Sequence, residues 1–289
     1  MISEISCTYY DKGQSLVYIY TLGIRVVLTQ KLMTDLSLIQ FSLIALIFAW
    51  SGFVSSGIGF GGALFTLPFL LLVHDDPLIF LPIISIHLLF FASTTLFNDQ
   101  YLSQKKQDHK IKTEVNWWFI RYSMAIMIIP KIAGVIGLLI LHVDLVNLII
   151  FSLIGAYALT YIFDKPMRSQ SRVMDIVFLV IGGYISGTSL VGGPLIIAVA
   201  MRHIASNQFR STLFVIWFIL VGIKMIGFSL ANVDLQFSNA LLLLPFAAVG
   251  HVIGLKTHQW LLQRDNHSFY RNIGWILLIT SLVGVMQAI

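Results

Sequence analysis

The sequence predicts an all-helical protein that crosses a membrane many times and consists of two inverted repeats. Of its 289 residues, 57% are hydrophobic and only 11% are charged, which lies far outside the composition of a soluble globular domain. The apolar residues gather in blocks of membrane length. One glycine-rich segment occurs twice, each time inside such a block. These observations set the class of fold.

Eight apolar blocks come close to or exceed the ~20 residues that cross about 30 Å of hydrocarbon as a helix. The blocks are Leu36–Val73, Pro77–Phe97, Trp117–Leu141, Leu145–Phe163, Val173–Met201, Ser211–Leu230, Asn239–Leu255 and Ile273–Ile289. Backbone groups cannot stay unpaired in lipid, and the blocks lack the two-residue alternation of a barrel, so we expect helices. In all we expect about 8–10 membrane segments.

Residues 1–35 do not resemble a removable signal peptide, because they lack a cationic start, a long apolar core and a small-residue cleavage site. Leu16–Leu28 is short for a crossing and carries Arg25, so we expect an interfacial helix there, with an extra crossing as the alternative. The single cysteine, Cys7, excludes an intrachain disulfide and a cysteine-rich metal site. We expect no metal and no cofactor.

Loop charge predicts the orientation of the spans, because Lys and Arg concentrate in cytoplasmic loops. Four connections carry these residues and should be cytoplasmic: Gln104–Lys112, Asp164–Arg172, Arg202–Arg210 and His258–Arg271. Three short connections carry none and should be external: His74–Asp76, His142–Asp144 and Asn232–Asp234.

Two blocks cannot be single straight crossings. Val173–Met201 begins and ends beside predicted cytoplasmic loops, and Leu36–Val73 has 38 residues, too many for one span. We expect each block to enter, turn at its glycine-rich segment and return. Each half is then a broken hairpin plus three crossings, which places the halves in opposite orientations. The predicted division is an N-terminal segment 1–35, a first repeat 36–163, a cytoplasmic linker 164–172 and a second repeat 173–289.

The duplicated segments are Ser55–Ala63 and Ser186–Pro194. Five features match at a constant offset of 131: Gly52/Gly183, Phe53/Tyr184, Ser55/Ser186, Gly61/Gly192 and Gly62/Gly193. Helix breaks at matched places in two halves of a membrane protein are typical of a transport site. A broken helix also offers free N–H groups and a positive dipole end, which suit an anion. The expected ligand-facing residues are Ser55, Ser56, Gly57, Gly59, Gly61, Gly62, Ser186, Gly187, Thr188, Ser189, Gly192 and Gly193.

Close helix packing is the alternative role for the glycines, since several are spaced as GxxxG. We assign only this role to Gly250 and Gly254.

Cationic residues in the spans support an anion. Lys131 lies near mid-membrane and Lys224 lies six residues before the end of its span, while the blocks contain no Asp or Glu away from their ends. A buried lysine without a carboxylate partner favours a site that receives an anion, and snorkelling to the interface is the alternative. Arg210, with Ser211 and Thr212, is expected at the cytoplasmic mouth as an attractor of anions or as a positive-inside anchor.

His87 and His251 lie mid-span and are the obvious groups there that titrate near neutral pH. Any proton coupling carried by the protein should involve one of them, although a structural hydrogen bond is the commoner role. An intramembrane serine protease using Ser189 and His251 is disfavoured, because the second glycine of its Gly-x-Ser-Gly motif is missing. Aromatic residues beside a basic loop fit an interfacial belt, so no nucleic acid is expected.

The doubled pattern Ser-Gly-x-x-Gly-x-Gly-Gly resembles the TauE/SafE family of sulfite and organosulfonate exporters. Further matches are Pro68, Gln208–Thr212, Val233-Asp234, Leu244-Pro245 and Gly250–Gly254, so the resemblance covers about residues 36–289. Ser56 and Leu190 depart from the family pattern, which usually has glycine at both positions. The resemblance implies sulfite, a sulfonate or a related organic acid as the substrate.

We therefore expect a multi-pass protein of the cell (inner) membrane that exports a small anion by alternating access, with proton or ion coupling as an option. A passive anion channel is the main alternative. A membrane enzyme or a receptor subunit is less favoured. The expected partners are the small anionic substrate and the lipid bilayer.

Overall fold

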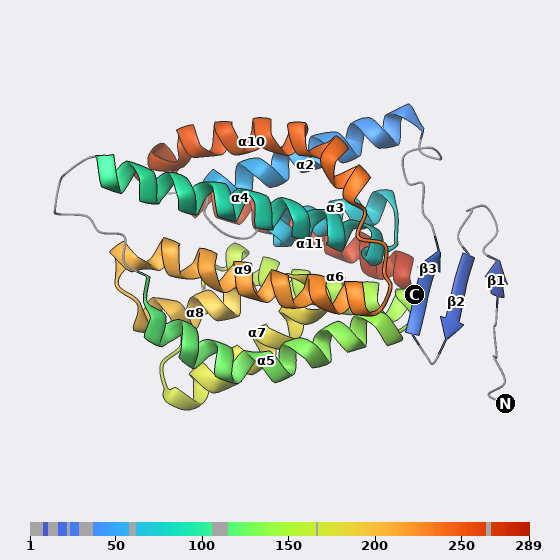
Figure 1. The fold of residues 1–289 in the computed structure, drawn as a ribbon, viewed down its shortest axis with the longest axis horizontal. Helices are drawn as coiled ribbons and strands as arrows, with labels where there is room; N and C mark the ends of the chain where they lie inside the picture. The colour runs from blue at the N-terminus through green and yellow to red at the C-terminus, as the bar shows by residue number, and fades with distance from the viewer. Residues whose placement is uncertain are drawn as a thin grey trace.

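The computed structural model describes residues 8–10, 17–21, 24–28, 37–57, 62–105, 115–165, 167–263 and 267–289. From residue 37 onward the described chain is helices and their connections (Figure 1). The helices are α2 (Leu38–Gly57), α3 (Gly62–Val73), α4 (Pro77–Lys105), α5 (Trp117–Ile140), α6 (Val143–Ile162), α7 (Arg172–Ser189), α8 (Gly193–His203), α9 (Ser206–Leu230), α10 (Phe237–Gln263) and α11 (His267–Ala288).

Among the described residues, eight helices are long and apolar enough to cross a membrane. The two helices that follow the glycine-rich segments, α3 with 12 residues and α8 with 11, are too short to cross alone. The prediction of an all-helical, multi-pass membrane body is confirmed.

The N-terminal segment differs from the expected helix. It forms a three-stranded antiparallel sheet, in the order β1 (Thr8–Tyr10), β2 (Val17–Thr21) and β3 (Ile24–Leu28). The helical expectation over Leu16–Leu28 is therefore wrong. Strands β2 and β3 are rich in Val, Ile and Tyr, whose branched and aromatic side chains favour extended backbone over a short helix.

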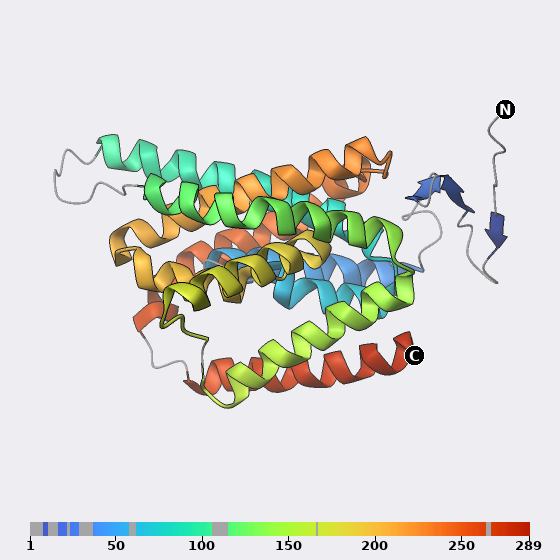
Figure 2. The same cartoon turned by 90° about the horizontal axis from the view of Figure 1, so that it is seen from below.

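The helix ends that flank the connections predicted as cytoplasmic lie at the opposite end of the bundle from those that flank the connections predicted as external. Figures 1 and 2 show α4, α6, α8 and α10 ending at the left, whereas α3, α5 and α9 end at the right, beside the C-terminus. The hairpin of α2 and α3 enters from the right and turns inside the bundle. The hairpin of α7 and α8 enters from the left and does the same.

Helix packing pairs elements of one predicted repeat with elements of the other. Helix α2 packs along α10, α5 along α7 and α6 along α11, and α4 lies against α9. The two most closely packed pairs, α2–α10 and α5–α7, each join the first helix of one half to the fourth helix of the other half. Both broken hairpins are thereby held between elements of both halves.

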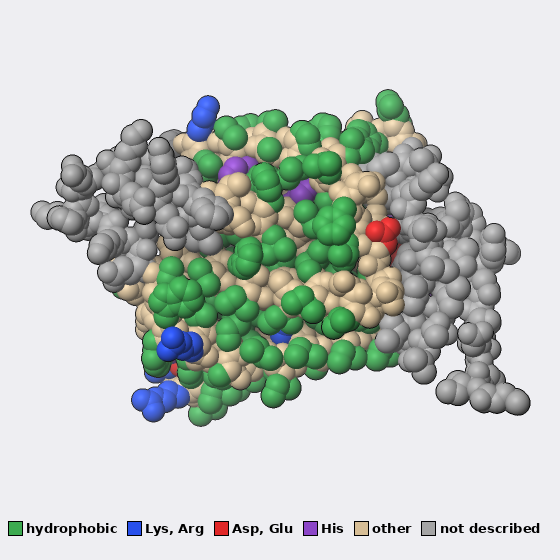
Figure 3. Space-filling view, viewed as in Figure 1, with side chains coloured by type: hydrophobic (Ala, Val, Ile, Leu, Met, Phe, Trp, Pro, Cys, Tyr) green, Lys and Arg blue, Asp and Glu red, His purple; other side chains and the backbone are tan. Residues whose placement is uncertain are grey.

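The outer surface suits lipid. Large apolar side chains such as Ile129, Leu241 and Ile279 are exposed on the flanks, and Figure 3 shows hydrophobic side chains over much of this face. Lys and Arg side chains stand out near the left end of this face, where α4, α6, α8 and α10 end, and one further blue patch lies near its middle. This distribution follows the positive-inside pattern of membrane proteins.

Candidate anion-binding site

Each broken hairpin turns at a glycine-rich segment in the middle of the bundle. Helix α7 stops at Ser189, Leu190 adopts a left-handed backbone with φ 62°, and α8 begins at Gly193 with Pro194 in its first turn. A left-handed backbone is costly for a branched residue and is usually left to glycine. Leu190 therefore occupies a glycine-type position, which agrees with its place in the repeated pattern. In the first half, α2 stops at Gly57 and α3 begins at Gly62.

The two breaks meet at one cavity, which we call the central hollow. It has a volume of ≈70 Å³, enough for a small ion or several waters, since one water needs about 10–15 Å³ by this measure. Its lining comes from α2, α3, α4, α7, α8, α9 and the α7–α8 connection: Ser55, Gly62, Ala63, Leu64, Leu88, Ser186, Leu190, Val191, Gly193, Pro194, Phe214, Trp217, Leu220 and Val221.

Two helix N-termini border the central hollow. Gly62 opens α3 and Gly193 opens α8, and these helices come from opposite halves of the chain. Helix N-termini carry unpaired N–H groups and a partial positive charge. The hydroxyl groups of Ser55 and Ser186 add donors, and among the described residues none that lines the hollow is acidic. This chemistry favours an anion.

A second cavity, the histidine hollow, shares part of this wall. Its volume is ≈40 Å³. Ser55, Leu88, Phe214 and Trp217 line both cavities. The remaining lining residues are Ser51, Gly52, Ser56, Ile84, His87, Phe91, Ala92, Ala247 and His251.

Both histidines have defined contacts. The Nε2 of His87 lies 2.8 Å from the carbonyl oxygen of Ala240, while its Nδ1 is buried with no hydrogen-bond partner in the described part of the chain. The Nδ1 of His251 forms a hydrogen bond with the hydroxyl of Ser56. Phe91 stacks on His251 with a centroid distance of 4.5 Å and meets His87 edge-on at 6.3 Å. The two predicted histidines thus lie on one cavity, linked through one aromatic ring.

The two buried lysines bind the end of α7 rather than the cavities. Lys131 Nζ donates to the carbonyl and hydroxyl oxygens of Ser186, at 2.8 and 3.0 Å. Lys224 Nζ donates to the carbonyl oxygens of Gly187 and Thr188, at 2.8 and 3.1 Å. Both side chains are fully buried. The ammonium groups supply donors to carbonyls in the last turn of α7, at the negative end of its dipole, where the Ser186 carbonyl also accepts from the backbone N–H of Leu190.

Several predicted residues lie away from the lining of either cavity. The hydroxyls of Thr188 and Ser189 donate to the carbonyl of Ile185 inside α7. Thr212 accepts a hydrogen bond from the backbone N–H of Asn116. The preceding residue, Ser211, is also buried.

Arg210 lies 5.6 Å from the ring centroid of Phe214, which lines both cavities. Gly59 and Gly61 lie outside the described residues.

Other predicted glycines allow close backbone approach. A Cβ at Gly187 would lie 2.4 Å from the carbonyl oxygen of Lys131, and one at Gly192 would lie 2.1 Å from that of Gly182. Gly250 and Gly254 face the carbonyls of α2 in the same way, and a Cβ at Gly254 would also lie 2.9 Å from the backbone nitrogen of Gly57. By contrast, of the described residues, a Cβ at Gly193 would meet only the Trp217 ring, at 3.7 Å.

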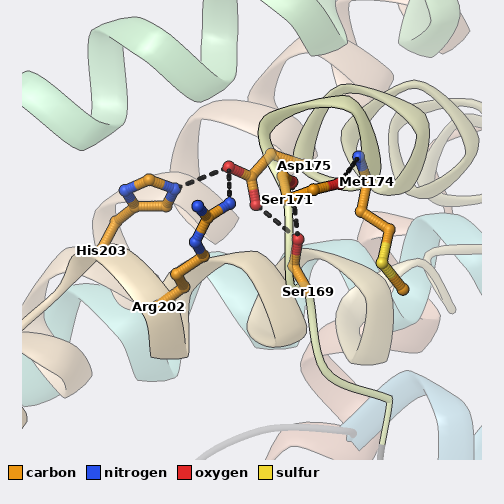
Figure 4. Close-up of polar contacts among 6 residues, drawn as sticks. All are labelled: Ser169, Ser171, Met174, Asp175, Arg202 and His203. Atoms are coloured by element: carbon orange, nitrogen blue, oxygen red, sulfur yellow. Dashed lines mark hydrogen bonds and ion pairs between the residues drawn. The ribbon is translucent and has the colours of Figure 1, made fainter.

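One polar cluster was missed by sequence reasoning. The buried carboxylate of Asp175 accepts hydrogen bonds from Ser169 at 2.5 Å, Arg202 at 2.8 Å and His203 at 2.8 Å (Figure 4). His203 also stacks on Phe119 of α5. The cluster joins the start of α7 to the end of α8. The signal for it was the predicted hairpin, which brings positions near 175 and 202 to the same end of the bundle.

Comparison with known proteins agrees with this architecture. A family model described as Sulfite exporter TauE/SafE matches residues 43–285, which is most of the chain. No curated protein and no solved structure matches it. The match spans both glycine-rich segments and both cavities. The chain is therefore a multi-pass membrane protein that belongs to the TauE/SafE family of sulfite exporter-type transporters.

Proposed function

We propose that this protein is a secondary transporter that exports a small anion across the cell (inner) membrane by alternating access. The substrate class is sulfite, a sulfonate or a related organic acid, bound in the central hollow. The observation that carries the proposal is the convergence of two helix N-termini, at Gly62 and Gly193, on one cavity whose described lining residues include no acidic side chain.

The charges around the cavity support an anion. Lys131 reaches the central hollow indirectly, through Ser186. Because the ammonium donates to the Ser186 oxygen, the hydroxyl hydrogen of Ser186 is free to point into the cavity. Lys131 thus serves as a positioning residue for a serine donor. The two buried lysines also add positive potential that an anion would offset.

The arrangement of the hairpins supports a carrier. Two hairpins that enter from opposite ends and meet at the middle are the scaffold of inverted-repeat carriers, with repeats at 36–163 and 173–289 joined by the linker 164–172. A cavity of ≈70 Å³ between the breaks is a binding site of limited size. Movement of one hairpin with its packed partner helix against the rest would open the hollow to one side at a time. A titratable histidine beside the site provides for proton coupling.

Counterflow in proteoliposomes tests the proposal. Vesicles that contain the purified protein and unlabelled methanesulfonate or sulfite should accumulate the labelled anion against its gradient, with saturation. Unsaturable flux without counterflow would identify a channel, and chemical conversion without flux would identify an enzyme.

Gly193→Val tests the site itself, because the valine side chain would project from the α8 N-terminus toward Trp217. It should remain in the membrane and lose counterflow.

A further inference from the structure

The packing of the two hairpins reveals a relationship between Lys131 and His251 that the sequence repeat does not show. A Cβ at Gly134 would meet Tyr184, Gly187 and Thr188 of α7, and a Cβ at Gly254 would meet Phe53, Ser56 and Gly57 of α2. The two sets of three partners differ by the same offset of 131 that relates the repeats. Gly134 and Gly254 are therefore equivalent positions on α5 and α10, and their numbers differ by 120.

A second pair of glycine contacts gives the same difference of 120 between positions on α5 and α10. Gly183 packs against the Met127 carbonyl, and its repeat partner Gly52 packs against the Ala247 carbonyl, at 3.0 and 1.9 Å from an added Cβ. Met127 and Ala247 also differ by 120. The offset places His251 at the position of Lys131.

The two residues also make related contacts. Lys131 Nζ donates to the hydroxyl of Ser186 in the second half, and His251 Nδ1 bonds the hydroxyl of Ser56 in the first half. Ser186 lines the central hollow and Ser56 lines the adjoining histidine hollow. Each half thus has a basic side chain behind a serine on its broken hairpin. The lysine is a permanent hydrogen-bond donor, but the imidazole becomes a positive double donor only when it binds a proton.

We propose that His251 is the proton-binding residue of the transport cycle, and that its protonation completes the anion site in the half that lacks the lysine. The inference rests on the proposed anion transport. Protonated His251 donates from Nδ1 to the Ser56 oxygen, which frees the Ser56 hydroxyl hydrogen to donate into the histidine hollow. Lys131 frees the Ser186 hydroxyl hydrogen in the same way at the central hollow. One proton then moves with each anion in the same direction.

The surrounding charges make proton and anion binding depend on each other. Helix α2 contributes Ser56 and no charged side chain, α4 contributes His87 across Phe91, and α9 contributes Arg210, which interacts electrostatically with His251. The charge of Arg210 opposes a second positive charge nearby, and an anion between them removes this repulsion. Anion binding therefore favours protonation, and protonation favours anion binding, as reciprocal linkage requires.

The decisive measurement uses the unaltered protein. Proteoliposomes hold a pH-sensitive dye inside, receive methanesulfonate outside and are clamped electrically with potassium and valinomycin. Methanesulfonate keeps one charge across the pH range in which histidine titrates, between about pH 5 and about pH 8. We expect acidification of the lumen with about one proton per anion taken up. Anion uptake without acidification would overturn the proposal while leaving the proposed transport intact. Absence of counterflow from the parent protein would contradict both the proposed anion transport and the proton-binding role of His251.

Two substitutions then locate the proton. His251→Gln keeps a hydrogen-bonding side chain beside Ser56 but cannot carry charge, so uptake driven by a pH gradient should fall by about tenfold and counterflow, which needs no net proton movement, should fall less. His251→Lys imitates Lys131 and should bind the anion with little dependence on pH. His142→Gln, on the connection beside Asp144 and remote from both hollows, is the control and should behave like the parent. Full gradient-driven uptake by His251→Gln would contradict the assignment.

Discussion

Lys131 of α5 donates hydrogen bonds to both oxygens of Ser186, at 2.8 and 3.0 Å, where the last turn of α7 approaches its end. A buried lysine near mid-membrane thus has backbone and hydroxyl partners, although no carboxylate of the described residues is recorded in contact with it. The contact fixes the end of the broken helix and orients a serine of the central hollow. The contribution of this contact to the stability of the protein can be measured.

Lys131→Met should destabilise the folded protein by about 1–3 kcal/mol, because the buried Ser186 hydroxyl oxygen loses its lysine donor and the Ser186 carbonyl is left with the N–H of Leu190. Removal of the buried charge offsets part of this cost. Thermal unfolding of the purified variant measures the change. A double-mutant cycle with Ser186→Ala should show coupling of about 0.5–3 kcal/mol. Additive effects would mean that the two side chains act independently.

Gly192→Ala and Gly193→Ala should differ although the residues are neighbours. A Cβ at Gly192 would lie 2.1 Å from the Gly182 carbonyl oxygen, which belongs to a packed helix, so we expect a loss of about 1–3 kcal/mol of stability. A Cβ at Gly193 would lie at an ordinary distance of 3.7 Å from the Trp217 ring, with no closer contact among the described residues. Gly193→Ala should keep its melting temperature and weaken anion binding by about tenfold, because the methyl group lies at the hollow.

Calorimetric titration with methanesulfonate, together with thermal unfolding, checks this pair. Unchanged binding by a stable Gly193→Ala variant would show that the α8 N-terminus does not contact the anion.

Asp175→Asn should open the base of the α7–α8 hairpin. The Asp175 side chain is 1% exposed and accepts from three donors, and removing one partner of a buried ion pair costs about 3–5 kcal/mol. Partial exposure of Arg202 places the expected loss near the lower end of that range. Asp144→Asn is the matched control, because its side chain is 60% exposed and should contribute about 0–1 kcal/mol. Equal melting temperatures for the two variants would contradict a stabilising role for the Asp175 cluster.

The C-terminus should be external. It follows α11 and lies at the end of the bundle that holds the Lys- and Arg-free connections. A C-terminal alkaline phosphatase fusion should be active and a fused green fluorescent protein dark, with fusions after Gln263 giving the reverse. A fluorescent C-terminal fusion would contradict the predicted orientation of both repeats.

Much of the fold follows from the sequence because the bilayer imposes strong rules. Membrane-length apolar blocks must be helices, and the basic loops divide the connections into the two groups that the structure places at opposite ends. The block Val173–Met201 begins and ends beside basic loops, so it had to turn back. The matched glycine segments located both turns, and with them Ser55, Gly62, Ser186 and Gly193 around the central hollow.

Only the tertiary structure decided which side chains meet across helices. Depth in the membrane suggested Lys131 as a direct ligand, yet the partner of its ammonium depends on how α5 packs along α7, and direct contact with the anion stays a prediction. The equivalence of Lys131 and His251 was hidden because α5 and α10 share no sequence pattern at those positions. The N-terminal strands also required the structure, because short segments rich in branched residues have no bilayer rule to fix their form. The sequence pattern thus determined where the chain crosses the membrane and where its helices break. Helix packing determined which polar side chains contact those breaks.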